Sequence, residues 1–173
     1  MESFYLTLIS DSCKNIFQSN TAAHFKTQLA QSICPPDRNY EMAVREVLIQ
    51  PLAAWKIALN LSPIFVYSDA CIPVHVGDTK GRLLRVLPPN VLTGHYCFAT
   101  PYYIPVGANN IENITISFHS KTGERHYFSD PTVPAIVVLH FREISNIKGC
   151  TEAGLASHRH GAASRERGVR ELF

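Results

Sequence analysis

The sequence predicts an all-β protein, an antiparallel sandwich or barrel with few helices. Apolar and polar residues alternate with period two over many short runs rich in β-branched and aromatic side chains, which is the pattern of half-buried strands. Clusters of Gly, Pro, Asn, Asp and Ser separate these runs and indicate turns. The chain has 173 residues, 46% of them hydrophobic, so it can bury one core.

The strand pattern occurs, in chain order, at residues 4–9, 24–29, 40–49, 64–67, 73–76, 83–87, 95–98, 111–118, 125–128 and 135–142. Turns are expected at residues 10–12, 35–37, 77–81, 88–90, 107–110 and 130–131. Residues 21–23 could open a helix capped by Asn20, but the alternation that follows favours a strand. Residues 52–59, between Pro51 and Pro63, fit either a helix or a strand entry with a connector.

Two segments predict particular strand environments. From Ile114 to His119 apolar and polar side chains alternate, and Gly123 stands where a turn needs a positive φ, so residues 111–128 are expected to form a hairpin. Residues 135–142 are more continuously apolar, which is typical of a central strand covered on both faces.

Charge and cysteine usage exclude several classes of protein. The formal net charge is +2, and residues 1–144 hold equal numbers of acidic and basic side chains, so we expect no nucleic-acid binding by the body. The five cysteines are scattered without a C-x-x-C pair, which argues against a disulfide scaffold and favours a reducing compartment. The N-terminus has neither a signal peptide pattern nor a membrane span, so we expect a protein that is not secreted.

The polar residues predict no catalytic residue, no cofactor and no metal. The eight histidines have no H-x-x-x-H pair and no carboxylate in ligand spacing, so a closed zinc set cannot be assembled. His95 and Cys97 should share a strand face, but without the base contact and the oxyanion site that activate a thiol. The cysteines are therefore expected to be buried and structural. Residues 76–81 lack the order of a phosphate-binding loop and are expected to be a surface turn.

An ordered series of short segments carries a family resemblance. It comprises FYLTL (4–8), SDS (10–12), NT (20–21), FKTQL (25–29), YEMAVREV (40–47), FVYSD (65–69), VGD (76–78), LLRV (83–86), PYYIPV (101–106), IENITI (111–116) and VLHFR (138–142). Over residues 3–144 the chain resembles the minor, penton-type capsid proteins of Polinton/Maverick elements and their adintovirus-like relatives. The link between Gln50 and Phe65 is shorter than in that family, which leaves open whether every strand is present.

The resemblance implies a single jelly roll over residues 1–144 and a structural role in a virion. The expected partners are copies of the chain, with a pentamer as one option, and the major capsid protein of the same element. The expected location is the virion, with the host nucleus or cytoplasm during assembly. Aromatic side chains suited to contacts around a symmetry axis are the candidate interface residues: Phe4, Tyr5, Tyr96, Phe98, Tyr102 and Tyr103. Since Phe4 and Tyr5 are adjacent in a strand, one of them should point outward.

Residues 145–173 form a C-terminal tail of different composition, expected to be a flexible, disordered appendage or a short docking helix. Its candidate contacts with nucleic acid are Arg159, Arg165, Arg167 and Arg170. Two other interpretations of the whole chain remain open: a ligand-binding β-sandwich module without enzymatic activity, and a degraded, element-derived fragment without activity.

Overall fold

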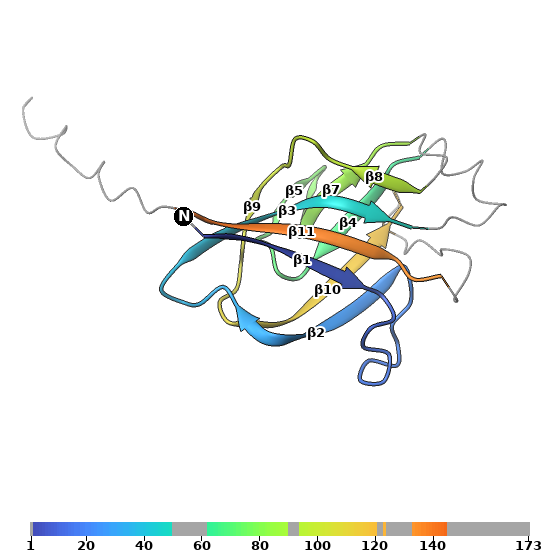
Figure 1. Cartoon of the computed structure of the whole chain (residues 1–173). Coiled ribbons are helices and arrows are strands. Elements are labelled where there is room, and N and C mark those ends of the chain that lie inside the picture. The colour runs from blue at the N-terminus through green and yellow to red at the C-terminus, as the bar shows by residue number, and fades with distance from the viewer. Residues whose placement is uncertain (1, 50–61, 90–93, 121–122, 124–132, 145–173) are drawn as a thin grey trace, which may run out of the picture.

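The computed structural model describes residues 2–49, 62–89, 94–120, 123 and 133–144, and these form an all-β sandwich (Figure 1). The first sheet has the order β1 (Ser3–Ile9), β11 (Ile136–Ile144), β3 (Asn39–Leu48) and β8 (His95–Cys97), with β9 (Ile104–Pro105) also paired to β3. The second sheet has the order β2 (His24–Ile33), β10 (Ile111–His119), β4 (Ile64–Ser68) and β7 (Leu83–Leu87). A separate hairpin joins β5 (Val74–Val76) to β6 (Thr79–Gly81).

The connectivity is that of a single jelly roll, as predicted. The chain moves back and forth between the sheets, so that β1 pairs with β11 and β2 pairs with β10, in antiparallel ladders. Apart from the two-residue β9 and the small hairpin, the described residues supply four strands to each sheet, which is the eight-stranded jelly-roll plan. All eight sheet strands of this plan are therefore present although the link between Gln50 and Phe65 is short. The question whether a strand is missing is thereby answered, and the jelly roll is complete.

The core lies between the two sheets and follows from the alternation in the sequence. Every second side chain of a strand faces inward, and these positions carry aliphatic or aromatic residues. The fully buried side chains include Leu8, Val44, Val137, Leu139 and Phe141 from the first sheet and Phe25, Val66, Ile114, Ile116 and Phe118 from the second. The sandwich therefore buries one continuous apolar layer, with the outer faces of both sheets left to polar and amphipathic side chains.

Several strand predictions are confirmed and two need correction. Residues 21–29 lead into strand β2 and not into a helix, and Leu83–Leu87 has the predicted bounds. Thr79–Gly81 was expected to be part of a turn but forms β6, because Gly77, at φ 63°, lets the chain reverse within two residues. The two-residue strand β9 was not expected. The expected strand at residues 125–128 and the ambiguous segment at 52–59 lie outside the described residues.

The first strand and the turn of the expected hairpin, and the central place of the last strand, are as predicted, while the returning strand of the hairpin lies outside the described residues. Gly123 has a φ of 83°, and its N–H donates to the Ser120 carbonyl at 3.0 Å, which closes the expected turn. Strand β11 is central, between β1 and β3. Its outward residues, such as Val138 and His140, are only partly buried, so the expectation that both faces are covered was wrong. No second layer of the described structure lies over that face.

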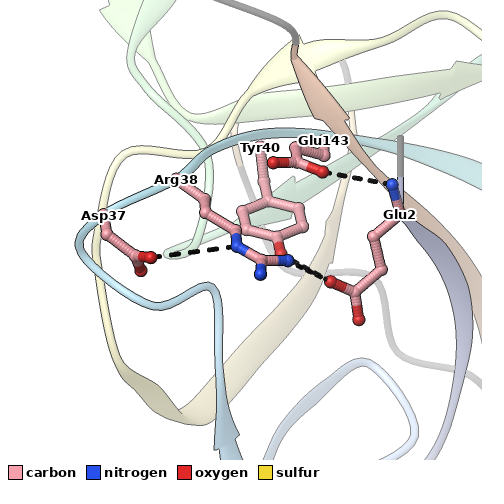
Figure 2. A network of polar contacts seen from close by, with 5 residues as sticks. All are labelled: Glu2, Asp37, Arg38, Tyr40 and Glu143. Carbon is pink, nitrogen blue, oxygen red and sulfur yellow. Dashed lines mark hydrogen bonds and ion pairs between the residues drawn. The ribbon is translucent and has the colours of Figure 1, made fainter.

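A polar network fastens one end of the first sheet (Figure 2). The Glu2 backbone N–H donates to Glu143 Oε2 at 3.1 Å, which ties the start of β1 to the end of β11. The Arg38 guanidinium lies between Glu2 Oε2, at 2.5 Å, and Asp37 Oδ2, at 3.9 Å, and the Tyr40 hydroxyl lies 3.5 Å from Glu2 Oε2. The network therefore links the strand ends to the turn before β3.

Candidate functional site: an aromatic surface on the first sheet

The outer face of the first sheet carries a connected group of aromatic and charged side chains. Outward positions place Tyr5 on β1, His140 and Arg142 on β11, and Glu41 on β3, while Tyr103 immediately precedes β9. We call these five residues the tyrosine cluster. The strand register explains their assembly, because Tyr5 pairs with His140 and Arg142 pairs with Glu41 across the antiparallel ladders.

Contacts within the tyrosine cluster hold its side chains in place. The Tyr5 and His140 rings stack, with centroids 4.5 Å apart and planes at 25°. The Tyr103 hydroxyl lies 2.6 Å from His140 Nδ1, and the Arg142 guanidinium lies 3.6 Å from the centre of the Tyr103 ring. Arg142 Nε also donates to Glu41 Oε1. Aromatic stacking, cation–π attraction and an ion pair thus limit the rotamers of the cluster before any partner binds.

The electrostatics of His140 suit a neutral imidazole. Burial lowers the pKa of His140 from 6.5, and the positive charges of Arg45 and Arg142 lower it further. Nδ1 of a neutral ring can accept a hydrogen bond from the Tyr103 hydroxyl, whereas an imidazolium, which carries a proton on both nitrogens, could not. At neutral pH the cluster therefore presents an aromatic surface whose cationic group, Arg142, is paired with Glu41.

Two tyrosine side chains of this region are largely exposed. Tyr5 is 63% exposed, and Tyr102, which precedes Tyr103, is 64% exposed. Tyrosine is enriched at protein interfaces, because its ring supplies contact area with few rotatable bonds and its hydroxyl still bonds with water.

The candidate aromatic residues divide between this surface and the interior. Tyr5 and Tyr103 belong to the tyrosine cluster on the outer face, Tyr102 is exposed, and Tyr5 is the outward member of the Phe4–Tyr5 pair, as the alternation required. Phe4 turns inward and stacks on Phe141 at 5.1 Å.

The other two aromatic candidates lie away from the outer face. Tyr96 is buried, because it pairs with the inward residue Val47 in the β3–β8 ladder. Phe98 is partly buried and lies 4.1 Å from the Arg85 guanidinium. The structure therefore does not gather Tyr96 and Phe98 with the exposed tyrosines.

Sequence reasoning missed His140, Arg142 and Glu41. The signal was present in residues 135–142, where His140 and Arg142 alternate with Leu139 and Phe141, but the run was interpreted as covered on both faces. Glu41 could be placed beside Arg142 only when the register between β3 and β11 was known.

The cysteines and His95 require a correction. Cys13, Cys34 and Cys71 are buried, as predicted, and burial raises the pKa of the Cys34 and Cys71 thiols to about 11. Cys97 is exposed, and its Sγ lies 3.3 Å from His95 Nε2. Glu46 Oε1 lies 2.6 Å from the same nitrogen. The expectations that Cys97 is buried and that His95 has no nearby carboxylate were therefore wrong, because the pairing of β3 with β8 brings these residues together.

A hollow between the ends of β1 and β2 offers the strongest alternative site. It has a volume of about 480 Å³ and is lined in part by Glu2, Phe4, Cys34, Arg38 and Tyr40. Its charged groups, Glu2 and Arg38, already bond to each other and hold the strand ends together (Figure 2). The ion pair in this hollow therefore has a structural role.

Over the described residues, the structure has no helix with the length and hydropathy needed to span a bilayer.

Fold and surface together define a jelly-roll domain with an exposed aromatic face. A solved structure of similar fold is that of the mavirus penton protein, with a TM-score of 0.55 and 9% sequence identity, covering 83% of this chain and 100% of that chain. No protein-family model matches the chain, and no curated protein matches it. The likeness establishes the shared fold. The candidate tail residues Arg159, Arg165, Arg167 and Arg170 lie outside the described residues.

Proposed function

We propose that this protein is a structural virion component, a minor capsid protein of penton type that assembles with copies of itself. The observation that carries the proposal is the fold shared with the mavirus penton protein over 83% of this chain and the whole of that one. The ordered series of segments over residues 3–144 that resembles Polinton/Maverick capsid proteins supports the same assignment. A role in a particle of that lineage is accordingly the function that sequence and fold favour together.

The tyrosine cluster and Tyr102 supply the surface for self-assembly. A ring of identical subunits needs a heterologous contact, in which one patch of each subunit meets a different patch of its neighbour. Aromatic side chains and arginine are enriched among the residues that dominate such interfaces. Tyr5 and Tyr102 are the most exposed large hydrophobic side chains of the described structure, and the contacts around His140 hold Tyr103 and Arg142 in position.

Other jelly-roll functions have less support. The fold also occurs in lectins and in cupins, which bind ligands in a concave site or within the barrel. In the described part of the chain, the one group suited to metal binding, Glu46, His95 and Cys97, lies on the outer face of a sheet. The two charged groups that line the hollow near Arg38 bond to each other. These observations favour function through surfaces over function through a pocket.

The proposal includes particular partners and a location. A penton-type protein occupies fivefold vertices, so we propose a pentamer that contacts the major capsid protein of the same particle in the virion. The arginines of the tail remain a prediction for contact with the packaged nucleic acid.

The test is the oligomeric state of the purified full chain, measured by light scattering after size exclusion and by negative-stain electron microscopy. We expect rings with a mass five times that of the chain. Tyr5→Ser should weaken the association by about 30-fold or more, because a central interface tyrosine contributes about 2 kcal/mol or more.

The matched control is Ile16→Ser, which removes an exposed hydrophobic side chain, 54% exposed, from the loop between β1 and β2. It should leave the oligomer intact. A wild-type chain that stays monomeric at every concentration would contradict the self-assembly part of the proposal, and equal loss in both variants would contradict the assignment to the tyrosine cluster.

A further inference from the structure

The second cluster on the outer face of the first sheet combines three side-chain types that bind zinc in proteins. Glu46 Oε1 and Cys97 Sγ lie 2.6 Å and 3.3 Å from His95 Nε2, and the ligand atoms of all three residues lie within 4.8 Å of one another. We propose that Glu46, His95 and Cys97 form a binding site for a divalent transition metal, with zinc as the expected ion. Because His95 and Cys97 are exposed and Glu46 is half-buried, water would supply the fourth ligand.

The sheet backbone fixes the three ligands. Glu46 and Cys97 stand directly opposite each other in the β3–β8 ladder, and His95 lies two residues before Cys97 on the same face of β8. In Figure 1, β8 runs beside β3 at the edge of the first sheet. The cluster therefore results from strand register and does not depend on a chance meeting of long surface side chains.

A single proton at His95 Nε2 can serve only one of its two close neighbours, Glu46 and Cys97, as a strong hydrogen bond. A ring nitrogen either carries one proton or offers one lone pair. If Nε2 carries a proton it can donate to Glu46, but it then cannot accept a hydrogen bond from the Cys97 thiol. If it offers its lone pair, it faces the acceptor oxygens of the Glu46 carboxylate. A metal ion satisfies all three groups at once, because each would supply a lone pair to the same centre.

The same geometry argues against a thiol nucleophile. In a Cys–His–carboxylate triad the thiol and the carboxylate bond to opposite nitrogens of the imidazole, so that the carboxylate orients the ring while the other nitrogen takes the proton. Here both Glu46 and Cys97 approach Nε2. The arrangement therefore fits shared coordination better than proton transfer.

Zinc can enter with a small opening of the cluster. Bonds of about 2.0–2.2 Å to nitrogen and oxygen and about 2.3 Å to sulfur, at tetrahedral angles, separate the nitrogen from the sulfur by about 3.5 Å and from the oxygen by about 3.4 Å. The Cys97–His95 distance of 3.3 Å is already close to this geometry. The Glu46–His95 distance must increase from 2.6 Å, which exposed side chains allow, since they are 44% and 45% accessible.

The site can be tested with the full chain freed of metal by a chelator. Titration with Co²⁺ should give a thiolate-to-cobalt charge-transfer band at one ion per chain, and Zn²⁺ should abolish it by displacement. Cys97→Ser should remove the band. His95→Gln and Glu46→Gln should each weaken Zn²⁺ binding by about tenfold or more, measured by competition with a chromophoric chelator.

Two controls keep the result specific. His75→Gln changes an exposed histidine on β5, and Cys150→Ser removes the thiol of the tail; both variants should bind Zn²⁺ and Co²⁺ like the wild type. Urea unfolding of each variant without metal establishes that it folds. A charge-transfer band that persists in Cys97→Ser but disappears in Cys150→Ser would overturn the proposal, as would unchanged Zn²⁺ affinity in folded variants of the three ligands. Because metal binding is measured on the chain itself, the outcome does not depend on the proposed capsid function.

Discussion

Adjacent substitutions at Phe4 and Tyr5 should have opposite effects on folding and on assembly. Phe4 faces the core, where its ring stacks on Phe141 at 5.1 Å and meets the edge of Tyr40 at 6.2 Å. Tyr5 is 63% exposed and stacks only on the partly buried His140 among the ring contacts of the described structure. Phe4→Ala should therefore destabilise the fold, whereas Tyr5→Ala should mainly weaken the association between copies.

The magnitudes follow from these contacts. Each aromatic pair contributes about 0.5–1.5 kcal/mol beyond the burial of its area. Phe4→Ala loses two such pairs. A partly buried phenylalanine also loses about half of the 1.5–3 kcal/mol that full burial contributes. The sum is about 3 kcal/mol for Phe4→Ala. Tyr5→Ala loses one exposed stack and should cost about 1 kcal/mol or less.

Urea unfolding followed by circular dichroism measures the first effect, and light scattering measures the second. With a slope of about 2 kcal/mol/M, Phe4→Ala should lower the unfolding midpoint by about 1.5 M and Tyr5→Ala by about 0.5 M or less. A larger loss of stability in Tyr5→Ala would refute the reasoning. It would mean that β1 is shifted by one residue against β11, because such a shift exchanges the two faces of a strand.

Two further predictions concern single polar groups. Because burial and the charges of Arg45 and Arg142 lower the pKa of His140, NMR should show this imidazole titrating below pH 6.5. The contribution of His140 to the free energy of unfolding should be complete above pH 6.5 and should decline as the pH falls toward the folded-state pKa. Arg142→Gln should raise the folded-state pKa, because it removes one of the positive charges. The Asn20 side chain donates to the Lys26 carbonyl and accepts from the Lys26 N–H, each at 2.9 Å. Asn20→Asp keeps only the acceptor and should lower the free energy of unfolding by about 1–3 kcal/mol. An unchanged urea midpoint would show that Asn20 does not anchor this loop.

The strands could be predicted because their information is local. Alternation places Ile114, Ile116 and Phe118 on one side of β10 without reference to any partner strand. The turn at Gly123 could be predicted because glycine readily adopts the positive φ that this turn requires. The same local information shows that one of Phe4 and Tyr5 points outward, but it does not decide which, because both residues are aromatic and the choice depends on the partner strand.

The local pattern of the sequence by itself determined that this chain is an antiparallel β-sandwich or barrel with inward and outward faces on each strand, since period-two patterning and turn residues are properties of neighbouring positions. Only the tertiary structure decided which outward residues meet. The pairing of β1 with β11 brought Tyr5 to His140, and the pairing of β3 with β8 brought Glu46 to Cys97. Such contacts join residues far apart in the chain, because strand order and register arise from packing the whole core, and no short segment encodes them.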